Sequence, residues 1–170
     1  MLEGVEIRPE VPGDEPEIGE VTVAAFVDLE ISGHTEQYVI RELRDAGALA
    51  VSLVAELDGR IVGHLALSPV TMSDSSTGWY GLGPMSVRPD LFGRGIGSAL
   101  VHEGLSRLRT AGAKGCCLVG HPSYYPRFGF RNTEELVHPG VPAEVFFVLP
   151  FDTSIPKGTV EFHEAFAATS

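Results

Sequence analysis

The sequence predicts an α/β protein with one mixed sheet and helices on both of its faces. Three observations lead to this fold class. The chain has 170 residues, a length typical of one domain of ~100–200 residues, so we expect a single domain over residues 1–170. Asp58-Gly59 lies between two apolar runs, which predicts an antiparallel hairpin. A strand, a helix and a short apolar strand then follow in order, which predicts a parallel crossover.

The first half of the chain predicts two helices and three strands. Apolar residues recur there at helical spacing in two segments, and each segment begins at a residue that commonly caps a helix. The expected elements are a strand over 5–8, a helix over 13–29 with Asp14 as its N-cap, a helix from the cap Thr35 to Gly47, and strands over 50–57 and 60–72.

The second half predicts one long helix among several strands. Gly81, Gly83 and Pro84 interrupt the first of these strands, which indicates a bulge or a place where another molecule approaches the backbone closely. The expected elements are strands over 79–87, 115–119, 144–149 and 158–162, a helix over 96–111, and one helical turn over 123–127.

The charge balance excludes some classes of partner. The chain has 12 Lys and Arg residues against 23 Asp and Glu residues, a formal net charge of −11. Phosphates must be neutralised by Lys or Arg, so we expect no general binding of nucleic acid or of anionic membranes. A local basic pocket, or a preference for cationic substrates, is compatible with this composition.

Cysteine usage and hydropathy favour a cytoplasmic protein. Cys116 and Cys117 are adjacent, so they point to opposite faces of a strand and are expected to be free, buried thiols. No apolar run approaches the ~18 residues of a membrane span, and the first residues lack the pattern of a signal peptide. His102-Glu103 begins like a zinc motif, but Ser106 occupies the last ligand position, so no metal is expected.

A glycine-rich turn, Gly93-Arg94-Gly95-Ile96-Gly97, joins the strand over 79–87 to the next helix. Free backbone N–H groups at a helix start can bind an anion, and the helix dipole and Arg94 favour negative charge there. The alternative is a tight turn that binds no ligand, and the turn alone does not decide between the two. Its spacing differs from that of a P-loop and from the dinucleotide motif G-x-G-x-x-G.

The turn and the segments around it resemble the GNAT superfamily of N-acetyltransferases, in particular a branch of bacterial predicted N-acetyltransferases of this size. The acetyl-CoA loop of the superfamily reads Gln/Arg-x-x-Gly-x-Gly/Ala, which falls here on Phe92-x-x-Gly95-x-Gly97. Phe92 replaces the usual Gln or Arg, but backbone contacts need no particular side chain. The Asp58-Gly59 hairpin and the segment Tyr124-Tyr125-Pro126-Arg127-Phe128-Gly129-Phe130 also match, so the resemblance covers nearly the whole chain.

The resemblance implies the GNAT fold, a central and mostly antiparallel sheet with a parallel β-α-β core that binds acetyl-CoA. The strand over 79–87 is then expected to separate from the strand over 115–119, and pantetheine to pair with it. The implied reaction is acetyl transfer from acetyl-CoA, a cosubstrate, to a primary amine by direct attack through a tetrahedral intermediate. The residues implied to bind the coenzyme are Met85, Ser86, Val87, Phe92, Gly93, Arg94, Gly95, Ile96, Gly97 and Ser98.

Tyr125 is the catalytic residue that the resemblance implies. It precedes Phe130 by five residues, where the superfamily's general-acid tyrosine usually sits. A tyrosine with an ordinary pKa of ~10 is protonated at pH 7 and can donate to a thiolate. The alternative is that Tyr125 only packs against Tyr124 and Phe128. The general base stays open between His121, His64, Glu30 and no dedicated base.

The acceptor is not specified by any motif. Glu30, His34 and Glu36 fall in the region that forms the acceptor pocket in the superfamily and would favour a cationic amine, although helix capping also explains them. Two rival functions remain, an acyltransferase that uses another acyl-CoA or an oxygen acceptor, and a non-catalytic CoA-binding sensor. Phe162 and Phe166 are suited to a contact between two copies of the chain, so a homodimer stays an alternative.

Overall fold

The computed structural model describes residues 2–30 and 32–170 and has two sheets. In the six-stranded sheet every neighbouring pair is antiparallel except β5 and β6, which confirms the expected mixed, mostly antiparallel sheet. Its strands, in spatial order, are β1 (Glu6–Pro9), β2 (Val51–Leu57), β3 (Arg60–Pro69), β5 (Trp79–Val87), β6 (Gly115–Val119) and β8 (Phe146–Pro150). The second sheet contains β4 (Thr71–Met72), β9 (Gly158–Glu161) and β7 (Leu136–Val137).

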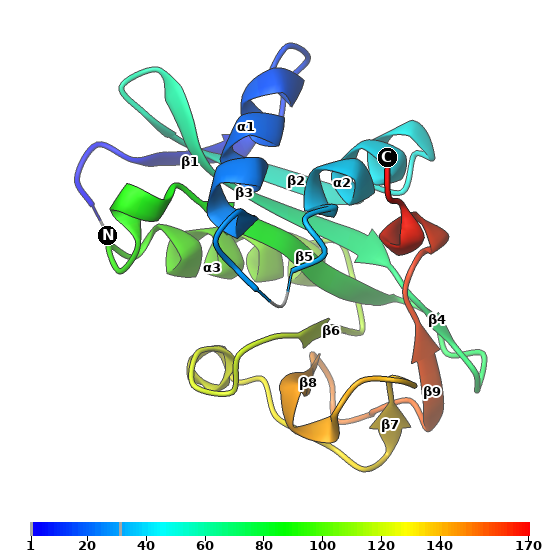
Figure 1. The fold of residues 1–170 in the computed structure, drawn as a ribbon. Coiled ribbons are helices and arrows are strands. Elements are labelled where there is room, and N and C mark those ends of the chain that lie inside the picture. Colours follow the sequence, from blue (N-terminus) through cyan, green and yellow to red (C-terminus); the bar gives the residue numbers. More distant parts are fainter. Residues whose placement is uncertain (1, 31) are drawn as a thin grey trace.

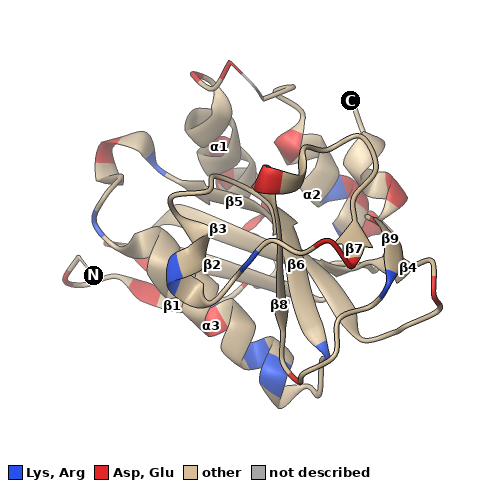
Figure 2. Ribbon diagram, turned by 90° about the horizontal axis from the view of Figure 1, so that it is seen from below, with Lys and Arg blue, Asp and Glu red and all other residues tan. Residues whose placement is uncertain are grey.

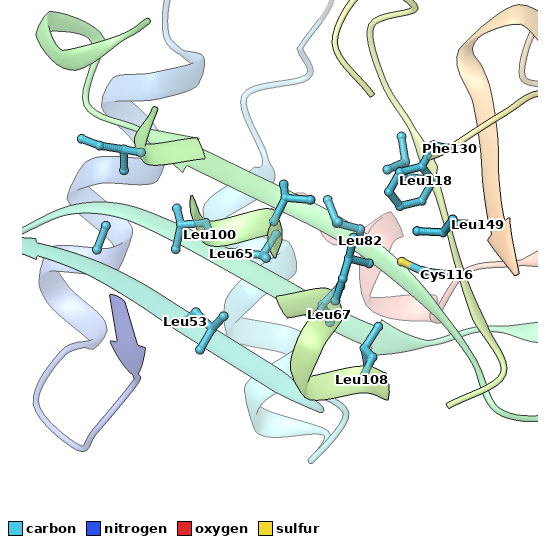
Figure 3. Close-up of a cluster of buried hydrophobic side chains, with 14 of the residues drawn as sticks. Leu53, Leu65, Leu67, Leu82, Leu100, Leu108, Cys116, Leu118, Phe130 and Leu149 are labelled. Atoms are coloured by element: carbon cyan, nitrogen blue, oxygen red, sulfur yellow. The ribbon is translucent and has the colours of Figure 1, made fainter. Parts of the chain in front are cut away.

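Helices cover both faces of the six-stranded sheet. Helices α1 (Glu15–Phe26) and α2 (Glu36–Asp45) lie on one face and α3 (Ile96–Thr110) lies on the other (Figure 1). Side chains along β2 alternate between the two faces of the sheet. Val54 packs with Ile18 of α1 and Ile40 of α2. Its neighbours Leu53 and Ala55 join the core under α3, and Figure 3 shows Leu53 in this core.

The two adjacent cysteines point to opposite faces of the sheet and belong to different hydrophobic cores. Cys116 belongs to the core beneath α3, whereas Cys117 packs with Trp79 and Val148 on the other face. Both thiols are free and fully buried, as the alternation predicted. Burial raises the pKa of both thiols, so neither is a nucleophile at neutral pH.

Several element boundaries that the sequence predicted were wrong. Helix α1 ends at Phe26 rather than at residue 29. Asp14 stands at its N-cap position, but its carboxylate binds the Arg8 guanidinium and the Val11 N–H instead of the helix start. The strand predicted over 60–72 is divided at Val70, after which β4 joins the second sheet. Strand β8 begins at Phe146 because residues 143–145 form a short 3-10 turn.

Strands β5 and β6 separate as they leave their shared end. Their parallel pairing covers Trp79–Gly115, Tyr80–Cys116 and Gly81–Cys117, and the register stops there. Beyond Gly81, β5 contains a cis Gly83–Pro84 peptide bond and stays paired to β3 on its other edge. This confirms the expected bulge and separation, and it exposes one edge of β5 to the space beside it.

The C-terminal segment closes one side of that space. After β9, a short 3-10 helix (Glu164–Ala167) packs on α2, where Ala165 and Phe166 contact the cluster around Val39 and Leu43. Phe162 lies across Gly81 of β5. Phe162 and Phe166 therefore pack within the chain, which accounts for their apolar character without a second copy. Across residues 2–30 and 32–170, no helix combines the length and the apolarity needed to cross a membrane.

Candidate active site

A cleft runs along the exposed edge of β5. Its volume is about 1640 Å³, larger than the roughly 300–1,000 Å³ of a pocket for one small ligand. Its walls come from α1, α2, β5, the start of α3, the loop after β6 and the C-terminal segment. A cleft of this size has room for two substrates placed end to end.

The start of α3 forms one end of the cleft. Gly95, the N-cap, has a left-handed φ of 83° and Gly93 a φ of 76°, conformations that favour glycine. No side chain in the described part of the chain caps this helix start, so the N–H groups of its first turn face the cleft free of protein partners. This arrangement fits an anionic group, because the helix dipole adds a partial positive charge there.

Side chains around this helix start leave its backbone accessible. A Cβ on Gly97 would lie 3.0 Å from the Tyr124 hydroxyl, so glycine lets Tyr124 approach closely. The Ser98 hydroxyl lies 3.4 Å from the same oxygen. Phe92 is 58% exposed at the cleft. Arg94 is the basic side chain within the turn. Arg88, which precedes the turn, is paired with Asp90 at 2.7 Å.

The exposed edge of β5 provides the middle of the cleft. Met85 and Val87 line it, whereas the Ser86 side chain is buried on the other side and its hydroxyl donates to Thr22 of α1 at 3.3 Å. Since β3 pairs with the opposite edge, the outward backbone groups of this segment have no strand partner among the described residues. An extended molecule can therefore pair with β5 as an additional strand would.

Tyr125 lines the cleft at the start of a short 3-10 helix (Tyr125–Phe128). Its ring contacts Phe130 and Phe147, with centroids 6.1 and 6.4 Å away, and it also packs edge-on against Tyr124. A Cβ on Gly120 would lie only 2.2 Å from the ring, so glycine is needed where Tyr125 sits. Burial, with smaller contributions from Tyr124 and Cys116, raises the pKa of Tyr125 to about 12.

The three base candidates lie in different surroundings. His121 lines the cleft, and its Nδ1 accepts hydrogen bonds from the Ser123 N–H and hydroxyl. Glu30 is exposed outside the cleft lining. His64 is fully buried in β3, with Nε2 2.8 Å from the Ser52 hydroxyl, and burial lowers its pKa to about 4. The structure thus brings His121 to the cleft and places His64 in the interior of the sheet.

The far end of the cleft is built by residues that sequence reasoning missed. Phe162 and His138 stack there with ring centroids 5.0 Å apart and an interplanar angle of 12°. Of the residues expected in the acceptor region, Glu36 lines the cleft and accepts the Ser32 hydroxyl at 2.8 Å, whereas His34 lies outside the lining. His138 precedes a turn-rich Pro-Gly segment and carried no motif, so its position depends on the tertiary fold.

Comparisons with known proteins match this architecture. The family model described as an acetyltransferase (GNAT) domain matches residues 48–132, half of the chain. An uncharacterized N-acetyltransferase of Escherichia coli, YhbS, is 34% identical over 126 residues, which cover 74% of this chain and 72% of YhbS.

Two solved structures share nearly the whole fold. A GNAT family acetyltransferase from Brucella melitensis, in complex with acetyl-CoA, is 46% identical, covers 95% of this chain and 97% of its own, and superposes with a TM-score of 0.86. Escherichia coli YhbS in complex with CoA is 30% identical, covers 100% of this chain and 96% of its own, and has a TM-score of 0.89.

The separated strand pair and the free helix start, together with these matches, define an acyltransferase. The sequence motifs predicted this class, and the fold neighbours confirm it. The chain belongs to the GNAT family of N-acetyltransferases.

Proposed function

We propose that this chain transfers an acetyl group from acetyl-CoA to a primary amine. The observation that carries the proposal is one continuous cleft with a free helix start at one end, an unpaired strand edge in the middle and Tyr125 beside it. The acetyl-CoA and CoA bound in the Brucella melitensis and Escherichia coli relatives support the donor.

The donor is held mainly by backbone groups. Its pyrophosphate binds the N–H groups of the turn and first helical residues, over Gly93 to Ser98, with Arg94 adding positive charge. Its pantetheine arm pairs with the edge of β5 over Met85 to Val87. Phe92 offers an exposed apolar surface at the cleft in place of the polar side chain of related loops.

The reaction follows from the position of Tyr125. The amine nitrogen attacks the thioester carbonyl carbon, and the resulting oxyanion faces a backbone N–H near Met85 or Ser86. The tetrahedral intermediate collapses as its C–S bond breaks, and the Tyr125 hydroxyl donates its proton to the departing thiolate. Because its pKa is about 12, Tyr125 stays protonated until this step. The acceptor ammonium gives one proton to His121 or to water before its nitrogen attacks, and a second proton that leaves the nitrogen of the intermediate restores the Tyr125 hydroxyl.

We also propose that residues 1–170 act as one cytoplasmic domain. Helices α1 and α2 from the N-terminal part and Phe162 from the C-terminal part line the same cleft, which supports one functional unit. Two buried free thiols suit a reducing compartment.

The test is Tyr125→Phe, assayed by release of free thiol over a panel of primary amines. We expect turnover to fall by about 10²–10⁴-fold, the usual contribution of a general acid. The dissociation constant for CoA, measured by calorimetry, should stay within about twofold of wild type. Tight CoA binding without thiol release from any amine would instead identify a CoA sensor, and unchanged turnover would exclude Tyr125 as the acid.

A further inference from the structure

The end of the cleft near Gly81 has an aromatic wall whose residues are not among those proposed to bind the donor. The Phe162 ring lies directly on Gly81, where a Cβ would come within 2.6 Å of Cε2. His138 stacks on the ring with a centroid distance of 5.0 Å, and Phe166 meets it edge-on at 5.3 Å. Gly81 is also the last residue of β5 that pairs with β6. The aromatic wall therefore adjoins the point where the strands separate, opposite the helix start.

The wall facing it is apolar as well. Phe26, the last residue of α1, and Leu29, in the segment that follows, line the cleft together with Val39 of α2. Leu29 is 45% exposed, so it presents apolar surface to the cleft. Burial lowers the pKa of His138, so its imidazole is neutral at pH 7 and the stack presents an uncharged surface.

The charges at this end are negative. Glu36, Glu161 and Glu164 line it, and Figure 2 shows acidic positions on α2 and on the C-terminal segment beside it. Within the described lining, Arg127 is the sole Lys or Arg side chain, and it lies over the Tyr124 ring at 4.5 Å near the helix start. The resulting field attracts a cation and repels an acid.

We propose that the acetyl acceptor is a small arylalkylamine, a flat aromatic ring joined by a short alkyl chain to one primary amine. This inference rests on the proposed function. The aromatic ring packs on the Phe162–His138 stack, and the alkyl chain directs the nitrogen toward the separation point beside Tyr125. The carboxylates draw in the amine as its ammonium form, which loses a proton before attack. An aliphatic polyamine or a protein lysine would leave the aromatic wall without a matching partner.

The test compares acceptors that each carry at least one primary amine. Thiol release is measured with 2-phenylethylamine, tyramine, n-butylamine, spermidine, a lysine peptide and β-alanine. We expect kcat/KM for the two aromatic amines to exceed that for n-butylamine by about tenfold, the effect of one good aromatic contact. β-Alanine, which carries a carboxylate, should be the poorest acceptor of the panel.

Two variants locate the preference. Phe162→Leu keeps an apolar side chain over Gly81 but removes the ring, so the ratio of kcat/KM for 2-phenylethylamine to that for n-butylamine should fall about 2- to 10-fold. Glu161→Gln combined with Glu164→Gln should raise KM for 2-phenylethylamine and weaken its dependence on salt. Val137→Ala, on β7 beside His138 but outside the cleft lining, is the matched control and should change neither quantity.

The outcomes separate the two proposals. If spermidine or the lysine peptide is the better acceptor, or if Phe162→Leu leaves the ratio unchanged, the arylalkylamine inference is wrong although the acetyltransferase stands. Absence of thiol release with every amine would contradict the proposed function itself. CoA affinity measured for each variant shows that it is folded, and the wild-type panel decides the preference even if Phe162→Leu does not fold.

Discussion

Replacing Gly120 with Ala should displace the Tyr125 ring and lower activity, although Tyr125 itself is unchanged. The new Cβ would lie 2.2 Å from Cε2 and 2.6 Å from Cδ2 of the tyrosine ring. Ordinary contacts begin near 3.4 Å, so the ring must move by about 1.2 Å. Phe130 and Phe147 pack against the same ring, so this shift also disturbs its support.

The expected magnitude follows from this displacement. A misplacement of about 1 Å at a reacting group can lower the rate by about 10²-fold, so kcat should fall by about two orders of magnitude. The helix start is on α3, not on the loop of Gly120, so CoA affinity should stay near that of wild type. The assay is thiol release under saturating substrates, combined with calorimetry for CoA.

A matched glycine provides the control. Gly19 lies inside α1, has no atom within 4 Å of an added Cβ and lies outside the cleft lining. Gly19→Ala should leave kcat unchanged and stabilise the fold by about 0.5–1 kcal/mol through helix propensity. If Gly120→Ala retains wild-type kcat while Tyr125→Phe does not, the close packing of the ring on Gly120 has no bearing on catalysis.

Two further predictions concern stability and donor binding. His64 has a pKa of about 4 in the folded chain and an ordinary value of 6.5 when unfolded, so its stabilising effect is complete above pH 6.5 and is lost as the pH falls toward 4. Urea unfolding should show a loss of about 2 kcal/mol between pH 7 and pH 5 that is absent in His64→Gln, and an equal loss in both proteins would refute this origin. Arg94→Ala should weaken CoA binding about fivefold at low salt, as an exposed ion pair contributes up to about 1 kcal/mol, and calorimetry at high salt should show a smaller difference. Identical affinities at low salt would exclude Arg94 from the pyrophosphate site.

The fold was predictable where short-range patterns determine it. Two features depend on neighbouring residues, the Asp58-Gly59 turn and the alternation across Cys116 and Cys117. The crossover through α3 depends on the order of consecutive segments. Gly81, Gly83 and Pro84 predicted a bulge in β5, the family resemblance implied that β5 would separate from β6, and the pairing does end at Gly81. A boundary failed where tertiary pairing prevailed over a local signal, as when the end of the strand predicted over 60–72 became β4 and paired with β9.

His64 shows why a residue type alone does not locate a base. Strand β3 is covered by helices on both faces, so nearly all of its side chains are buried, the polar His64 and Ser68 included. The Nε2 atom of His64 is hydrogen-bonded to Ser52, which in turn donates to Glu10, and Glu10 is held by Arg44 at 2.8 Å. These partners come from three other segments, and no spacing in the sequence predicts that they converge.

The two ends of the cleft differ in how they are encoded, and this difference explains what the sequence reveals. The proposed donor end consists of backbone groups of one contiguous stretch, from β5 into α3, so a glycine spacing suffices to indicate it and Phe92 can replace a polar residue. The proposed acceptor end consists of side chains from α1, α2, the loop at His138 and β9. Each contributes one or two residues with no motif of their own. Substrate choice can therefore change by single substitutions such as one at Phe162, while the donor end and the fold remain intact.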